Sequence, residues 1–360
     1  MAVCGRSWEN LSSTQDIPYV TSGGGIGGLA LAAFICFYSK DIAVDVYETK
    51  NEISSIGAGI AIWKRTWQTL QDIGLEEEVK KRNISLPKDG EDGPLTVSRP
   101  MLLDMLKSRL SNLCTIYTSS HVANYEETPD GLVVINLRDG TTRTADILIG
   151  CDGVHSATRA TFFRNLARIH PSKGYKRFCE PTWSGALAYR GLVDRSKLRE
   201  RNPQNHALDN PRIHVVTHPF GDIVNLVCFY NKDNGFGTPF ADEWVANVPK
   251  EEVIECYKDW EPDLVEAVSM IQTPSRWAIH IVESLPLFVS GPVGLLGDAA
   301  HAMVPHQGVG GGQAIEDAHI LGRLLAHEKT NHSNLSKVLE IYQKVRLPQA
   351  QAAAQRSWSN

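Results

Sequence analysis

The stretch TSGGGIGGLALAA, residues Thr21–Ala33, decides the fold of this chain. Gly23, Gly25 and Gly28 have the G-x-G-x-x-G spacing that follows the first strand of a dinucleotide-binding βαβ unit. In such a unit the first glycine permits the tight turn, the second admits a pyrophosphate to the backbone, and the third brings the next helix close to the sheet. The free N–H groups at the start of that helix then face the phosphates. A glycine run alone also fits a surface loop, so the flanking sequence has to decide.

The flanking sequence favours a dinucleotide site over a surface loop. The apolar run Leu29–Tyr38 predicts the helix, and Ile42–Tyr47 predicts the second strand. Glu48 ends that strand 20 residues after the last glycine of the motif (48 − 28), where an acidic residue holds the ribose of NAD or FAD. The first strand, predicted over Asp16–Thr21, is short and contains Pro18, which strands tolerate mainly at their start or edge.

The composition is that of a globular protein. The chain has 360 residues, of which 42% are hydrophobic and 21% charged, which is enough for two domains. A net charge of −5 does not favour a nucleic-acid partner. The seven cysteines form no C-x-x-C pair, which indicates a reducing, cytoplasmic location. Met1–Thr14 lacks the apolar core of a signal peptide, and Leu29–Tyr38 is shorter than the roughly 20 residues of a membrane span.

The pattern along the chain predicts a dinucleotide-binding domain built from both ends of the sequence. An apolar strand followed by small residues recurs at Gly150–Gly153 and Gly297–His301. From about residue 165 the pattern changes to alternating strands, Trp183–Val193 and Ile213–Tyr230. We therefore expect an α/β fold, a three-layer Rossmann-like domain with an inserted antiparallel-sheet α+β substrate domain, and a ligand between the two. The expected boundaries are residues 15–165 and 285–350 for the two-part domain and 166–284 for the insert.

One long segment carries a family resemblance. Gly297–Asp317 reads GDAAHAMVPHQGVGGGQAIED, which is highly specific. Five further segments agree with it: Gly23–Gly28, Glu48, Arg99, Cys151–Arg159 (CDGVHSATR) and Tyr189–Gly191. Together they resemble the class A FAD-dependent aromatic monooxygenases of the p-hydroxybenzoate hydroxylase-like superfamily, and among these the fungal salicylate hydroxylase-like proteins. The resemblance extends from about Val20 to Leu347.

The resemblance implies a bound FAD, with NAD(P)H as co-substrate. The cofactor contacts that it implies are Gly23, Gly25, Gly28, Glu48, Gly59, Ala61, Arg99, Asp152, Asp298 and Gly311. Glu48 would bind the adenosine ribose, and Arg99 would reach the pyrophosphate or the ribityl chain. The glycines of Gly308–Gly312 would let the flavin approach the backbone, with the positive end of the following helix at its pyrimidine edge. Asp152 and Arg159 also fit a structural ion pair.

The insert holds the two candidate catalytic residues. The resemblance implies that Arg190 points at the substrate or the flavin, and its bidentate, permanently charged group suits a carboxylate or phenolate. An arginine on a solvent-exposed edge strand is the alternative. His218 stands where the family often has a tyrosine, and a histidine there could act as acid or base. His301 and His306 are five residues apart, which is not the spacing of a helical zinc pair, so no metal is expected.

The resemblance implies an NAD(P)H-consuming monooxygenase that hydroxylates an aromatic or phenolic substrate through a flavin C4a-hydroperoxide. Salicylate-like substrates would be hydroxylated with loss of CO₂. Alternatives are a secondary-metabolite hydroxylase or epoxidase of the same family, or an inactive flavin-binding scaffold from a truncated gene. The last rests on the weak first strand, on His218 and on the chain ending at Asn360, soon after the last predicted helix; the segment before Arg99 is also shorter than in typical relatives. The sequence identifies neither the substrate nor the oligomeric state.

Overall fold

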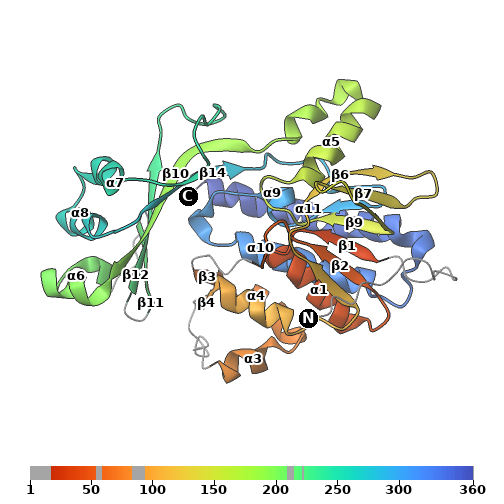
Figure 1. Cartoon of the computed structure of the whole chain (residues 1–360), viewed down its shortest axis with the longest axis horizontal. Helices are drawn as coiled ribbons and strands as arrows, with labels where there is room; N and C mark the ends of the chain where they lie inside the picture. Colours follow the sequence, from red (N-terminus) through yellow and green to blue (C-terminus); the bar gives the residue numbers. More distant parts are fainter. Residues whose placement is uncertain (1–17, 54–58, 83–93, 209–214, 221–222, 360) are drawn as a thin grey trace.

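The computed structural model has a parallel sheet at its centre (Figure 1). It describes residues 18–53, 59–82, 94–208, 215–220 and 223–359, and of residues 206, 215–220 and 223 it describes the backbone alone. The strand order in the sheet is β15-β16-β9-β1-β2-β5, in which only β15 runs antiparallel to its neighbour. The strands are β1 (Tyr19–Ser22), β2 (Val44–Tyr47), β5 (Cys114–Tyr117), β9 (Ile147–Gly150), β15 (Val289–Ser290) and β16 (Val293–Leu295).

Two apolar helices pack together beside this sheet. They are α1 (Ile26–Tyr38) and α10 (Gly310–Leu325), and both contribute mainly small and aliphatic buried side chains. Their approach is close: a Cβ added at Gly322 would lie 2.6 Å from the Cβ of Phe34. Shorter elements surround them, namely β3 (Gly59–Ile62), β4 (Leu95–Ser98), α2 (Lys64–Asp72), α3 (Leu75–Lys81) and α4 (Arg99–Lys107).

The other face of the parallel sheet meets a second, three-stranded sheet and α5 (Figure 1). This sheet has the order β6-β7-β8, and α5 contacts both β6 and β9. The elements are β6 (Val122–Glu127), β7 (Val133–Leu137), β8 (Thr142–Ala145) and α5 (Ala157–Ile169). The result is the three-layer arrangement that the sequence predicts, with the parallel strands buried between the other two layers.

An antiparallel sheet with its own apolar core forms the other end of the molecule (Figure 1). Its order is β11-β12-β10-β14-β13. The strands are β10 (Thr182–Asp194), β11 (Val215–Phe220), β12 (Ile223–Asn231), β13 (Val245–Asn247) and β14 (Ser275–Ile281), and the helices beside them are α6 (Arg195–Arg201), α7 (Lys250–Tyr257) and α8 (Pro262–Ser269). The predicted combination of an α/β fold with an inserted antiparallel sheet is therefore confirmed.

The chain returns to the first domain after β14. After β16 the chain forms α9 (Asp298–His301), then α10, and then the long α11 (Leu335–Trp358). The short 3₁₀ helices are η2 (Pro171–Lys173), η3 (Tyr175–Phe178), η4 (His206–Leu208), η5 (Pro305–Gln307) and η6 (His332–Asn334). Among the helices of the described residues, none combines the length and the apolar character that crossing a membrane requires.

Candidate active site

The carboxyl ends of the parallel strands bring the predicted loops together. Hydrogen bonds join them: the N–H of Cys151, after β9, donates to the carbonyl of Ser22 at 2.7 Å, and that of Leu296, after β16, to Gly150 at 3.0 Å. In a parallel sheet this edge is where ligands bind, because all its loops and helix N-termini open there. The three glycine- and aspartate-containing segments singled out in the sequence therefore form one continuous rim.

The first glycine loop is shaped by close backbone contacts. Gly23 has φ +106°, and a Cβ there would lie 2.4 Å from the carbonyl oxygen of Cys151. A Cβ at Gly28 would lie 2.0 Å from the carbonyl oxygen of Gly23, so the start of α1 can rest on the turn only when residue 28 is glycine. Gly25 is the N-cap of α1 and provides no side-chain hydrogen bond to the first N–H groups of the helix. These donors suit an anionic group such as a pyrophosphate.

Glu48 lies beside this loop, as predicted. One carboxylate oxygen accepts the N–H of Gly24 at 2.9 Å, and the other accepts the N–H of Lys50 at 2.9 Å. The side chain is half-buried at the end of β2. Each carboxylate oxygen has further acceptor capacity, so Glu48 can hold ribose hydroxyls while it orders the loop.

Asp152 and Arg159 order the next loop. The Asp152 carboxylate accepts bonds from the Ser156 hydroxyl and, at 3.0 Å each, from the N–H and hydroxyl of Thr158, all at the start of α5. The buried Arg159 donates to the carbonyls of Val154 at 2.7 Å and Ala299 at 3.2 Å, so it joins the loop after β9 to α9. Burial lowers the pKa of Arg159, and the charge of Asp152 acts in the opposite direction, so the two groups interact electrostatically. The cofactor contact of Asp152 stays a prediction.

The third loop meets the start of α10. The Asp298 side chain is exposed, and a Cβ at Gly310 would lie 4.0 Å from its Oδ1. Among the described residues, a Cβ at Gly311 would meet Ile26 and Ile60 within 4 Å, at 3.5 and 3.6 Å. These two isoleucines belong to α1 and to β3, the strand of Gly59 and Ala61, so α10 begins beside both predicted glycine segments.

Two arginines from different domains lie close together above this rim. Arg99 is the first residue of α4, and its Nη2 would lie 3.7 Å from a Cβ at Gly25, with no other atom of the described residues within 4 Å. Arg190 lies on β10, with its guanidinium 4.8 Å from the ring centre of Trp277. Burial lowers the pKa of Arg190, and the nearby charge of Arg99 lowers it further. The Nε of Arg190 is buried and has no hydrogen-bond partner in the described part of the chain.

The other candidate catalytic residue, His218, lies on β11, where the backbone pairs with Asn225 of β12. Its side chain is outside the described residues. A role for His218 as acid or base therefore stays a prediction.

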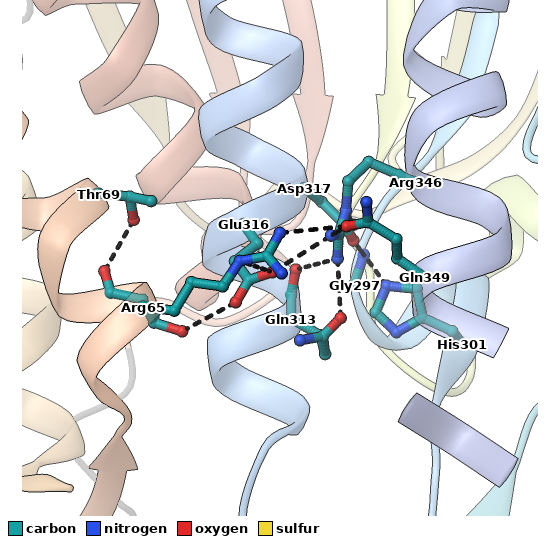
Figure 2. Close-up of polar contacts among 10 residues, drawn as sticks. Arg65, Thr69, Gly297, His301, Gln313, Glu316, Asp317, Arg346 and Gln349 are labelled. Carbon is teal, nitrogen blue, oxygen red and sulfur yellow. Dashed lines mark hydrogen bonds and ion pairs between the residues drawn. The ribbon is translucent and has the colours of Figure 1, made fainter. Parts of the chain in front are cut away.

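A buried ionic cluster lies directly behind the third loop (Figure 2). The carboxylate of Asp317, on α10, accepts the N–H of Gly297 at 3.0 Å and contacts the Nε2 of His301 at 2.6 Å. Arg346, on α11, donates to the other oxygen of Asp317 at 2.6 Å. Gly297 has φ +63° and immediately precedes Asp298, so the cluster fixes the turn that carries a predicted cofactor residue.

Arg346 has three further hydrogen-bond partners. Its Nη1 lies 3.2 Å from Glu316 and 2.8 Å from the Gln349 side chain, and its Nη2 lies 2.9 Å from the Gln313 side chain. Every nitrogen of the guanidinium is thereby bonded (Figure 2). Asp317 and Arg346 are fully buried, and buried charges persist when they are paired in this way.

Comparisons with known proteins agree with this geometry. A protein-family model described as an FAD binding domain matches residues 243–357 of this sequence. A salicylate hydroxylase of Pseudomonas putida is 33% identical, over 91% of this chain and 81% of its own length. The chain belongs to the salicylate hydroxylase-like FAD-dependent monooxygenases. A 6-methylsalicylate 1-monooxygenase of Aspergillus terreus is 30% identical, over 91% of this chain and 79% of its own. The solved structure of a salicylate hydroxylase substrate complex has a TM-score of 0.79 at 29% identity, over 96% of this chain and 88% of its own.

The rim of this monooxygenase fits a flavin dinucleotide. The loop glycines leave the backbone accessible at Gly25 and Gly311, where an added Cβ would meet no atom closer than 3.5 Å. The positively charged Arg99 and Arg190 lie near the same region. The Nε of Arg190, which has no partner among the described residues, can donate a hydrogen bond to an anion. The rim thus offers Glu48 to a ribose, the glycine loop to a pyrophosphate and the two arginines to an electron-rich ring.

Sequence reasoning missed the cluster behind the rim. Asp317 and His301 belong to the family-specific segment Gly297–Asp317, but the sequence did not assign them to a buried ionic cluster. Arg346 belongs to a predicted helix. One signal was present: Glu316 and Asp317 interrupt an otherwise apolar helix face, and carboxylates on such a face need buried partners.

Proposed function

We propose that this monooxygenase hydroxylates an aromatic ring that carries an anionic group, a carboxylate or a phenolate. The observation that carries the proposal is Arg190, a half-buried arginine within the electrostatic influence of Arg99, whose buried Nε has no hydrogen-bond partner in the described part of the chain. Two adjacent cations in a partly desolvated place favour a negatively charged ligand. The names of two relatives, salicylate hydroxylase and 6-methylsalicylate 1-monooxygenase, indicate substrates of this class.

Bound FAD would supply the oxygen chemistry, with electrons from NAD(P)H and one atom of O₂ entering the ring. The polypeptide's share is binding, orientation and exclusion of water. Glu48 would hold the ribose, and the N-termini of α1 and α10 would face the pyrophosphate and the flavin. Arg190 would orient the substrate anion, so that its ring lies next to the reactive edge of the cofactor. A hydroxybenzoate with its carboxylate ortho to the hydroxyl would lose CO₂ in the reaction.

The proposal includes two finer points. The separate apolar cores support the division into residues 15–165 with 285–350 and residues 166–284, although η3 and Cys179 pack in the first core. The free thiols at six described cysteines support a reducing, cytoplasmic location.

The direct test is NAD(P)H oxidation by the purified flavoprotein with a panel of aromatic compounds. Hydroxybenzoates should stimulate oxidation and yield a hydroxylated product, whereas the same rings without a carboxylate or hydroxyl should not. Equal stimulation by uncharged rings would refute the anionic-substrate assignment. A yellow protein that no pyridine nucleotide reduces, with every member of the panel present, would support the inactive scaffold instead.

Glu48→Ala is expected to weaken FAD binding by about 1–3 kcal/mol, because charged hydrogen bonds to the ribose are lost. This corresponds to a roughly 5- to 150-fold higher Kd, measured by titrating the apoprotein with FAD. Glu52→Ala, which removes an exposed carboxylate nearby, is the control and should bind FAD normally. Unchanged flavin content of Glu48→Ala after gel filtration would remove Glu48 from the site.

Asp298→Ala is expected to raise the Kd for FAD by an amount equivalent to about 1–2 kcal/mol. Since the Asp298 side chain is exposed, its loss should leave the thermal stability of the apoprotein nearly unchanged. The FAD titration and the apoprotein melting curve are measured on the same samples. Full flavin content with full turnover would show that the loop after β16 binds no cofactor through this carboxylate.

A further inference from the structure

Two cysteines that are distant in the sequence contact each other in the fold. Cys36 lies near the end of α1, and Cys114 begins β5, the last strand of the parallel sheet. The two side chains adjoin, and each thiol affects the protonation of the other. The hydroxyl of Ser111, in the turn before β5, donates to the Cys36 sulfur at 3.4 Å. Cys36 is buried and Cys114 half-buried, so the pair can be approached from the Cys114 side.

The surroundings favour a thiolate on Cys36 and a protonated thiol on Cys114. The hydrogen bonds from Cys114 and Ser111 and the charge of Lys40 lower the pKa of Cys36, and they outweigh its burial. Lys40 is held in place by its own hydrogen bond to the Cys36 carbonyl, at 2.9 Å. The hydrogen bond to Cys36, burial and the charge of Asp45 raise the pKa of Cys114. The pair therefore consists of a nucleophilic sulfur and a neighbouring thiol that can resolve its oxidation product.

We propose that Cys36 and Cys114 form an oxidation-sensitive dithiol site, which hydrogen peroxide converts to a disulfide. The Cys36 thiolate attacks one peroxide oxygen, the O–O bond breaks, and the other oxygen leaves as water after taking up a proton. The sulfur of Cys114 then attacks the resulting sulfenic acid, and the S–O bond breaks. The hydroxyl leaves as water with the proton of Cys114. In sum, two thiols and one peroxide give one disulfide and two waters, with both sulfurs oxidised and both peroxide oxygens reduced.

The other described cysteines lack this environment. Burial raises the pKa of Cys151, Cys179 and Cys228, and at Cys179 it outweighs the charge and the hydrogen bond of Arg164. Cys256 donates its S–H to the Tyr189 hydroxyl at 3.8 Å, and its pKa is raised as well, mainly by burial. Peroxide should therefore react first at the Cys36–Cys114 pair.

The test treats the FAD-loaded enzyme with graded hydrogen peroxide, blocks the remaining thiols in denaturant and digests with trypsin without reduction. Cleavage after Arg6, Lys40, Arg109 and Arg138 leaves Cys36 alone in peptide 7–40 and Cys114 alone in peptide 110–138. The expected result is a linked pair of these two peptides, lower in mass by two hydrogens, which disappears on reduction. It should form at lower peroxide than any oxidation product of Cys256.

Matched variants separate a dithiol site from general oxidation. Cys256→Ser should form the link like the wild type. In Cys114→Ser, peroxide should carry Cys36 on to sulfinic acid, because the resolving thiol is gone, and in Cys36→Ser the Cys114 thiol should stay reduced. The Cys114→Ser change lies on an outer strand, and circular dichroism with flavin content checks its folding. Separate sulfinic acids in the wild type, or a link formed no earlier than oxidation of Cys256, would overturn the proposal.

Discussion

Arg346→Met is expected to lower the free energy of unfolding by about 3–5 kcal/mol, the range found when one partner of a buried ion pair is removed. Methionine replaces the aliphatic part of the arginine side chain but brings no charge. Asp317 would keep its carboxylate in a fully buried place, without the guanidinium that compensates its charge. The measurement is urea unfolding at a fixed excess of FAD, so that cofactor linkage is the same for each variant.

Arg65→Met is the matched control for Arg346→Met. Both arginines pair with the same carboxylate, because the Nε of Arg65 lies 3.5 Å from Glu316. The Arg65 side chain is 69% exposed, however, so its pair is screened by water. Its loss should cost at most about 1 kcal/mol. Equal losses for the two variants would mean that burial does not decide the strength of these pairs.

Acidic pH should lower the free energy of unfolding of the wild-type enzyme, because Asp317 becomes protonated. Burial by itself raises the pKa of Asp317, but the charges of His301 and Arg346 outweigh this and hold the pKa below its ordinary value. The stabilisation is then complete above the unfolded-state pKa of about 3.9, and it is lost as the pH falls through the lower pKa of the folded state. In Arg346→Met the folded-state pKa of Asp317 should rise toward or above the unfolded-state value, so the stability that acid removes through Asp317 should shrink and the urea midpoint should fall less steeply with decreasing pH. Identical pH profiles would contradict this.

The parts of the site that the sequence predicted are those with local patterns. The turn after β1 needs glycine at two positions for steric reasons, and Glu48 follows at the distance that one helix and one strand require. The buried strand β9 is a continuous apolar run, which is typical of a central parallel strand. Such features depend on neighbours in the sequence, so they can be read without the fold.

The parts that the sequence could not predict are contacts between distant segments. Arg346 meets Asp317 because α11 packs on α10, and the charge of Arg99 reaches Arg190 although the two residues are 91 positions apart in the chain (190 − 99). No spacing rule links these pairs. The hydrogen bonds that Asp152 accepts at the start of α5 were likewise not predicted, and its cofactor contact stays a prediction. A matched motif gives the place of a side chain, while its hydrogen-bond partners depend on the whole fold.

Arg190→Ala is expected to lower kcat/KM for an anionic aromatic substrate by about 2–4 kcal/mol, or roughly 30- to 1,000-fold. The guanidinium is held by β10 and by Trp277, so it is already oriented before the substrate binds. Arg190→Lys should recover only part of the loss, because an ammonium cannot form two parallel hydrogen bonds.

Flavin content separates a substrate role of Arg190 from a cofactor role. Arg190→Ala should retain nearly normal FAD, unlike Glu48→Ala and Asp298→Ala, since the residues proposed to hold the dinucleotide belong to the other domain. Arg199→Ala, which removes an exposed arginine of α6 on the same insert, should have wild-type kinetics. NAD(P)H oxidation coupled to product detection is measured with flavin absorbance on the same samples. If Arg190→Ala and Arg190→Lys both have wild-type kinetics, the unpartnered guanidinium does not meet the substrate, and the anionic-substrate proposal loses its structural support.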